Sequence, residues 1–273
     1  MQAQIRSLVR ARMYEPRNET QIRKGTDMIQ PSDVLAPKRY RVLSGSALKL
    51  IAVISMFIDH ASKRLLVRNP AITETLFTVG THDISWFYIL TSIIGRLAFP
   101  IFCFLLVEGF VYTRDRRRYG CNLLLFALIS EVPFDLCRML TPFDPSYQNV
   151  FFTLFVGYLG MCAFERFKDN RAMQAVSVIG LALVSMALKC DYGERGYALI
   201  MICYLLRDNA VAKSALGCCV TSASWRAGLA FIPINCYNGK RGFIKGPVLK
   251  YAFYAFYPVH LLFLWWVRTQ LHV

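Results

Sequence analysis

The residues of this sequence that are best suited to chemistry are ionisable side chains within or at the ends of long apolar stretches. A charged side chain that faces lipid is energetically costly, so an ionisable residue in such a stretch is a candidate functional residue. The candidates are Asp59, His60, Arg96, Glu108, Glu131, Asp135, Asp191 and His260. Their types suit proton transfer, anion binding and the ion pairs that support a buried site.

His60 is the candidate for acid–base chemistry, because an imidazole titrates near neutral pH and Asp59 directly precedes it. In a dry cavity an Asp–His pair can take a proton from an amine or hydroxyl acceptor, with the carboxylate orienting the ring. The alternative is an ion pair between Asp59 and Lys63, one helical turn apart, with His60 marking the membrane interface. The sequence leaves both interpretations open.

Arg96 is the candidate for binding negative charge, because no acid lies close to it in the sequence. A guanidinium suits a phosphate or carboxylate ligand, or the oxyanion that develops when a carbonyl is attacked. The alternative is an ion pair with Glu108, Glu131 or Asp135 on a neighbouring helix, since buried charges usually pair. The two roles are compatible with each other.

The other candidates fit supporting roles. Glu131 and Asp135 lie four residues apart on one face of an expected helix, on either side of Pro133. They can be partners of the buried arginine or a second acid–base pair. Asp191 and His260 lie near the ends of expected spans, where helix caps and interfacial anchors are common.

The elements that must position these residues are membrane spans. Of the 273 residues, 55% are hydrophobic and 18% are charged, and the formal net charge is +15. Basic charge between long apolar stretches indicates a polytopic membrane protein, and excludes a disordered chain and a simple nucleic-acid-binding protein. The nine cysteines and four histidines show no metal-ligand spacing and no disulfide framework, so no metal is expected.

The apolar stretches predict an all-α transmembrane bundle of about eight spans, with seven to nine possible. A bilayer core requires about 20 apolar residues per helix. The second stretch is too long for one straight helix and contains Gly95, Arg96 and Pro100, which predicts a kink or break. The expected spans are residues 47–66, 84–112, 121–140, 150–165, 172–189, 196–206, 214–234 and 248–267.

The chain divides by composition into residues 1–42 and residues 43–273. The first part is basic and has no apolar run, which predicts a disordered cytoplasmic extension, with a membrane-surface helix as the alternative. An even number of spans places both termini on one side. Most Lys and Arg residues then fall on that side, which predicts cytoplasmic termini, although residues 240–250 place basic charge on the other side.

Seven sequence blocks in a fixed order resemble the TraX family of membrane proteins. The resemblance covers about residues 43–264 and leaves the N-terminal extension outside it. The blocks are LKLIAVISMFIDH, GRLAFPIFCFLLVEGF, RRYGCNLLLFALISEVPFDL, NVFFTLFVG, DYGERGYALI, YNGKRG and KYAFYAFYPVHLLFL.

The resemblance implies an N-terminal acetylase of pilin in conjugation systems, with acetyl-CoA as the donor. The family is similar to the wider group of transmembrane acyltransferases, which pass acyl groups from cytosolic donors to acceptors at or across the membrane. That group uses an intramembrane histidine, and the matching position here is His60. A match between Arg96 and the functional arginine of that group is left open.

Together, the residues and the resemblance predict an inner-membrane acyltransferase that moves acetyl from acetyl-CoA to an amine or hydroxyl. The expected partners are the lipid bilayer, acetyl-CoA and a pilin or other exported acceptor. In this hypothesis His60 is the base, Asp59 orients it, and Arg96 contacts the donor or the oxyanion. The alternatives are a proton-coupled transporter, against which the lack of an internal repeat counts, and a non-catalytic assembly factor of a conjugation or secretion system.

Overall fold

The computed structural model describes residues 40–80, 82–221, 225–244 and 246–271. The chain divides into residues 1–38 and residues 39–273, and all elements described below belong to the second unit. Of the N-terminal extension that the sequence predicts at residues 1–42, residues 1–39 lie outside the described part of the chain.

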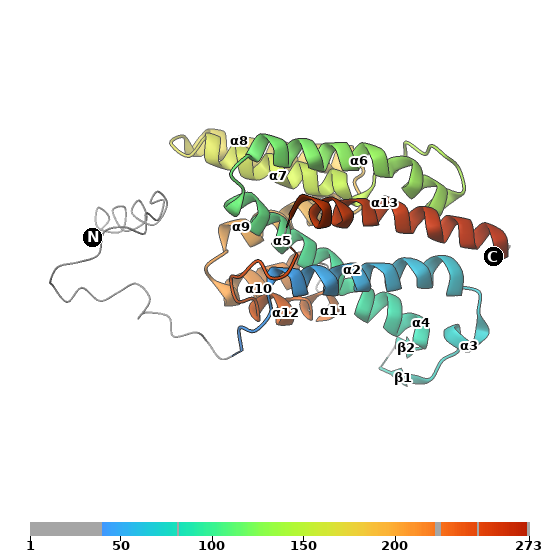
Figure 1. The fold of residues 1–273 in the computed structure, drawn as a ribbon. Helices are drawn as coiled ribbons and strands as arrows, with labels where there is room; N and C mark the ends of the chain where they lie inside the picture. Colours follow the sequence, from blue (N-terminus) through green and yellow to red (C-terminus); the bar gives the residue numbers. More distant parts are fainter. Residues whose placement is uncertain (1–39, 81, 222–224, 245, 272–273) are drawn as a thin grey trace. The chain divides into compact units, whose positions relative to one another are not determined.

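The described chain is mainly helical (Figure 1). The longer helices are α2 (Gly45–Ala61), α5 (Ala98–Tyr112), α6 (Arg116–Met139), α7 (Val150–Arg166), α8 (Arg171–Ala187), α9 (Gly193–Leu205), α10 (Ala210–Val220) and α13 (Gly246–Leu271). The short elements are α3 (Pro70–Thr73), α4 (Trp86–Tyr88), α11 (Trp225–Gly228), α12 (Phe231–Asn235), the π-helices η1 (Ser62–Leu66) and η2 (Ile89–Ile94), the 3₁₀-helix η3 (Gly95–Leu97), and the antiparallel strands β1 (Phe77–Val79) and β2 (His82–Ile84).

Polar side chains set the starts of these helices. A side-chain oxygen at the N-cap accepts a backbone N–H that has no partner within the helix, which stabilises the first turn by about 1 kcal/mol. The N-cap residues of α2, α6, α7, α8 and α10 are Ser44, Asp115, Asn149, Asn170 and Asn209, and each accepts such a bond. Short polar residues therefore account for most of the starts of the longer helices.

Four helical segments of the described chain are long and apolar enough to cross a membrane, so the prediction of about eight spans is not confirmed. These segments are Gly45–Leu66, Trp86–Tyr112, Arg116–Met139 and Gly246–Leu271. The seventh expected span, residues 214–234, is not one helix, because α10 ends at Val220 and the short helices α11 and α12 follow. The all-α class is confirmed.

The second span changes helix type where the sequence predicts a kink or break, but it continues as one helical segment, Trp86–Tyr112. The helix passes from η2 through η3 into α5, so its hydrogen-bonding pattern changes at Gly95 and again at Ala98. Pro100 lies in the first turn of α5, where a missing N–H costs little. A Cβ atom at position 95 would overlap the carboxyl group of Asp59, so this glycine lets the two spans approach.

Helices α7 and α9 also pack closely through glycines. Gly157 and Gly160 of α7 face Ile200 and Tyr197 of α9, and a Cβ atom at either glycine would overlap these side chains. Small residues at such contacts allow the dispersion contacts and short interhelical bonds that hold helices together in lipid. This packing fixes the start of α9, where Asp191 precedes the helix, against the rest of the bundle.

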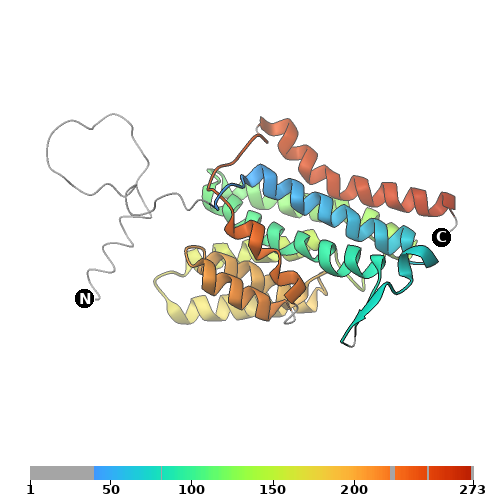
Figure 2. The ribbon, with the colours of Figure 1, turned by 90° about the horizontal axis from the view of Figure 1, so that it is seen from below.

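Helices α2 and α13 run parallel, from one end of the bundle to the other (Figures 1 and 2). Their starts are tied together, because the N–H groups of Gly45 and Ser46 donate to the carbonyls of Lys240 and Arg241 at 2.8 and 2.9 Å. Residues 40 and 271 therefore lie at opposite ends. The expectation that both termini share a side does not hold for the described residues.

Basic side chains gather at the end that holds the starts of α2, α6 and α13, which we call the basic end. Residues 240–250 belong to it, so the sequence-based placing of these residues on the other side is wrong. The described Lys and Arg of this end are Arg41, Lys49, Arg114, Arg116, Arg117, Arg118, Arg166, Lys168, Arg171, Arg207, Lys213, Lys240, Arg241 and Lys250. The opposite end has half as many, namely Lys63, Arg64, Arg68, Arg138, Lys189, Arg195 and Arg268.

Candidate functional site

Two histidines from the parallel helices α2 and α13 form a hydrogen-bonded pair. The Nδ1 atom of His60 lies 2.8 Å from the Nε2 atom of His260, and the two rings are parallel. The Nδ1 atom of His260 lies 2.8 Å from the carbonyl oxygen of Phe256, one turn earlier in α13. The His260 side chain is buried. The pair therefore joins two helices that are 200 residues apart in the sequence.

These contacts assign the hydrogen atoms of the neutral pair. A carbonyl oxygen only accepts, so Nδ1 of His260 carries the hydrogen and Nε2 of His260 has a lone pair. Nδ1 of His60 must then donate to Nε2 of His260, which leaves Nε2 of His60 as a free acceptor. A histidine held in this tautomer by its other ring nitrogen is arranged as a general base.

Aromatic rings surround the pair. The rings of Phe57, Phe256 and Tyr257 lie 6.2, 5.0 and 5.6 Å from the His260 ring, measured between centroids. The Tyr257 ring also lies 6.3 Å from the ring of His60. Such an apolar setting excludes water and strengthens the electrostatic interactions of any polar group held within it.

Asp59 binds Lys63 and does not hold His60. The Nζ atom of Lys63 lies 2.7 Å from Oδ2 of Asp59, which is the ion pair that the alternative interpretation of the sequence expected. The other carboxyl oxygen, Oδ1, is buried against Gly95 without a hydrogen-bond partner. The hydrogen bond that fixes His60 comes from His260, for which the sequence suggested only a supporting or interfacial role.

Arg96 lies on η3 with an exposed side chain and forms no ion pair with any residue in the described ranges. The ion pair that the sequence offered as its alternative role is absent there. Glu108 instead binds Nε of Arg207 at 2.7 Å near the basic end, and the same guanidinium donates to the hydroxyl of Tyr112 at 2.9 Å. Glu108 therefore lies away from the histidine pair and ties α5 to the loop after α9.

Glu131 and Asp135 have local partners on the chain that follows α6. The side-chain amide of Asn149, the N-cap of α7, donates to Glu131. Asp135 accepts the backbone N–H of Asp144 at 2.8 Å, and Asp144 also binds Arg138 at 2.6 Å. Both acids thus hold the α6–α7 connection in place, and neither contacts Arg96.

Asp191 lies in the turn before α9 and shares an electrostatic environment with Asp59 and Lys63. The hydroxyl of Tyr147 donates to its backbone oxygen at 2.6 Å and lies 3.1 Å from its carboxyl oxygen Oδ1. Burial raises the pKa of Asp191 to about 6, while the Tyr147 hydrogen bond opposes this rise. The structure therefore brings Asp59, His60, His260 and Asp191 into one region, and places Glu108 outside it.

Replacing Asp191 with asparagine is expected to stabilise the protein at neutral pH but not at pH 4. An unfolded aspartate has a pKa of about 3.9, whereas Asp191 in the folded protein has a pKa of about 6. The stability that the protonated Asp191 carboxyl contributes is therefore fully present below about pH 3.9 and is lost as the pH rises through about 6. The variant avoids this loss, which amounts to about 1–3 kcal/mol. Thermal unfolding in detergent at pH 4 and pH 7.5 measures the change in stability, with the variant of an exposed residue, Asp208→Asn, as control. Equal shifts of the unfolding temperature at both pH values would contradict the prediction.

Two features of this region were missed by sequence reasoning. Tyr147 lies in a loop, and nothing in its local pattern indicates that its hydroxyl reaches Asp191. The pairing of His60 with His260 has one available signal, since each histidine lies a similar number of residues into its span. That signal predicts a contact only if the two helices are known to run parallel. No group of three or more His, Cys, Asp or Glu side chains in the described ranges is arranged to hold a metal ion.

Comparison with known proteins finds a family model that this sequence matches. The model of the family described as TraX protein matches residues 44–268, which include the two histidines of the pair, His60 and His260. The chain is similar to the probable fimbrial assembly protein FimC, serogroup H1, of Dichelobacter nodosus, with 28% identity over 250 residues that cover 81% of this chain and 94% of the relative. No solved structure matches this chain.

Proposed function

We propose, because this chain belongs to the TraX family, that it is a membrane acetyltransferase that moves acetyl from acetyl-CoA to the amine of a pilin-like acceptor. The observation that carries the proposal is the His60–His260 pair, which leaves Nε2 of His60 as a free proton acceptor among aromatic side chains.

The pair suits the proton transfers of acyl transfer. Nε2 of His60 takes a proton from the acceptor nitrogen as that nitrogen attacks the thioester carbonyl. A C–N bond forms, the C–S bond breaks, and the departing CoA thiolate takes the proton back from His60. His260 keeps the ring oriented throughout, because its Nε2 accepts from Nδ1 of His60.

Arg96 suits the negative charge that forms on the thioester oxygen. Its side chain is exposed, it has no ion-pair partner among the described residues, and it follows Gly95, which contacts Asp59. A positioned donor to an oxyanion typically contributes about 100- to 1,000-fold in rate. Arg96 is therefore the proposed contact of the oxyanion or of the donor.

The distribution of basic residues supports a direction for the reaction. Cytoplasmic ends of membrane proteins are enriched in Lys and Arg, so the basic end faces the cytoplasm in this proposal. Acetyl-CoA then enters from the basic end, and an exported acceptor arrives from the opposite end, near the carboxyl ends of α2 and α13.

The name of the similar protein favours a second candidate function. That protein is called a probable fimbrial assembly protein, which supports a pilin-like partner here and fits a non-catalytic assembly factor equally well. The two functions differ in what the isolated protein does. An acetyltransferase modifies its acceptor without other components, whereas an assembly factor leaves the acceptor chemically unchanged.

The test is transfer of radiolabelled acetyl by the purified protein in lipid nanodiscs to pilin-derived peptides. We expect label on a peptide with a free N-terminal amine and none on the same peptide with a blocked amine. Protein with full helical content that labels no acceptor, in either membrane orientation, would contradict the proposal and favour the assembly factor.

A further inference from the structure

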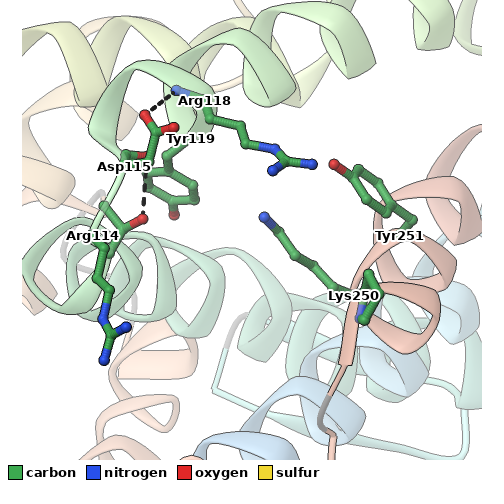
Figure 3. A pocket seen from close by; sticks show the side chains of 8 residues that line it. Arg114, Asp115, Arg118, Tyr119, Lys250 and Tyr251 are labelled. Atoms are coloured by element: carbon green, nitrogen blue, oxygen red, sulfur yellow. Dashed lines mark hydrogen bonds between the residues drawn. The ribbon is translucent and has the colours of Figure 1, made fainter.

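A hollow of about 300 Å³ opens between the starts of α6 and α13, at the basic end and away from the histidine pair (Figure 3). Its lining combines three basic side chains, two tyrosines and a single acid. The lining residues are Thr113, Arg114, Asp115, Arg118, Tyr119, Pro247, Lys250 and Tyr251. The hollow thus has the size and polarity for a small charged group.

The cations of this hollow lack acidic partners. Arg114, Arg118 and Lys250 form no ion pair with any residue that the structure describes. The one acid, Asp115, uses its carboxylate to accept the backbone N–H of Arg118 at 2.9 Å as the N-cap of α6. Figure 3 shows the side chains of Arg118, Lys250 and Tyr251 pointing toward one another across the gap. Like charges that converge in this way repel each other unless an anion lies between them.

Phosphate is the anion that this set of groups recognises best. A guanidinium donates two parallel N–H bonds to phosphate oxygens, and a lysine ammonium adds a point charge. The Tyr251 hydroxyl, which Figure 3 shows beside Arg118, supplies a further hydrogen-bonding group. A carboxylate ligand would use fewer of these donors.

The hollow and the histidine pair are connected by α13. Lys250 and His260 are ten residues apart on this helix, which corresponds to roughly 15 Å at 1.5 Å per residue. The pantetheine arm of CoA, from its phosphate to its sulfur, is a chain of about thirteen bonds. Since three bonds of an extended chain span about 3.5 Å, the arm reaches roughly 15 Å.

We propose that this hollow binds the phosphates at the nucleotide end of a CoA thioester, with the pantetheine arm running along α13 toward His60. The inference rests on the proposed function and adds to it the place where the donor binds. The same phosphate chemistry is present in the headgroups of anionic lipids, so the experiment compares the two sources.

The experiment measures binding of CoA and of adenosine 3′,5′-bisphosphate to the full-length protein in nanodiscs of neutral lipid. The double variant Arg118→Gln/Lys250→Gln is expected to bind both compounds at least 100-fold more weakly, about tenfold for each cation removed. Arg117→Gln is the matched control, because Arg117 lies on the same turn of α6 but does not line the hollow. This variant should bind CoA and adenosine 3′,5′-bisphosphate as tightly as the wild-type protein. A parallel series adds vesicles of phosphatidylglycerol as competitor.

The outcomes separate this inference from the proposed function. Unchanged CoA binding by the double variant overturns the donor site, even if the wild-type protein transfers acetyl. Displacement of bound adenosine 3′,5′-bisphosphate by phosphatidylglycerol, with no binding of CoA, assigns the hollow to a lipid headgroup and overturns the donor site as well. CoA binding that is lost in the double variant supports the donor site, even if a separate assay finds no acetyl transfer and the proposed function fails.

Discussion

Replacing His60 with alanine is expected to lower the rate of acetyl transfer by about 100- to 10,000-fold, the usual contribution of a positioned general base. The loss should appear in kcat, because Nε2 of His60 is free to accept a proton but is not needed to bind the donor. Binding of CoA should therefore be unchanged. The neighbouring fold should tolerate the change, since alanine removes one hydrogen bond to His260 and no charge.

The matched control is His82→Ala, because His82 is exposed on β2, outside the site, and this variant should keep full activity. Both proteins are compared with wild type for initial rates of label transfer, after size-exclusion chromatography and thermal unfolding have shown equal folding. A well-folded His60→Ala protein that transfers acetyl at the wild-type rate would rule out His60 as the base.

The sequence predicts the parts of this fold that depend on local chemistry. The change of helix type at Gly95 follows from a small residue and a nearby proline within an overlong apolar stretch. The first span is expected at residues 47–66 and found at Gly45–Leu66, because an apolar run and its N-cap serine are local signals. Local signals also select His60 as a candidate, because an imidazole lies in an apolar setting, and its role stays a prediction.

The direction of the helices could not be predicted in the same way. Counting apolar stretches treats residues 214–234 as a full crossing, which reverses the direction of the last span. In the structure this segment is divided into α10, α11 and α12, and Tyr237 returns to pair with Leu43 beside the start of α2. Hydropathy reports the composition of a segment and not the course of its backbone. A segment that enters the bundle and turns back therefore has the same hydropathy as one that crosses the membrane.

The hydrogen-bond partner of His60, His260, could not be predicted from the sequence for a related reason. Sequence neighbours suggest Asp59, but successive residues on a helix point in different directions, and the carboxylate faces Lys63 one turn later. His260 reaches His60 only because α2 and α13 start at the same end, at similar distances before each histidine. Contacts between residues so far apart depend on the whole topology, which local patterns do not contain.

His260 is expected to act on the reaction through His60, as a positioning residue. His260→Phe keeps an aromatic ring of similar size but cannot accept from Nδ1 of His60, so the base tautomer is no longer favoured. We expect kcat to fall by about 10- to 100-fold, the range found when a metal-binding histidine loses its orienting hydrogen-bond partner, with the KM for acetyl-CoA unchanged. His260→Gln restores an acceptor oxygen at a similar reach and should recover activity to within about fivefold of wild type. A merely structural role for the ring predicts the reverse order, with phenylalanine active and glutamine impaired, and initial rates of the two variants at saturating donor decide between them.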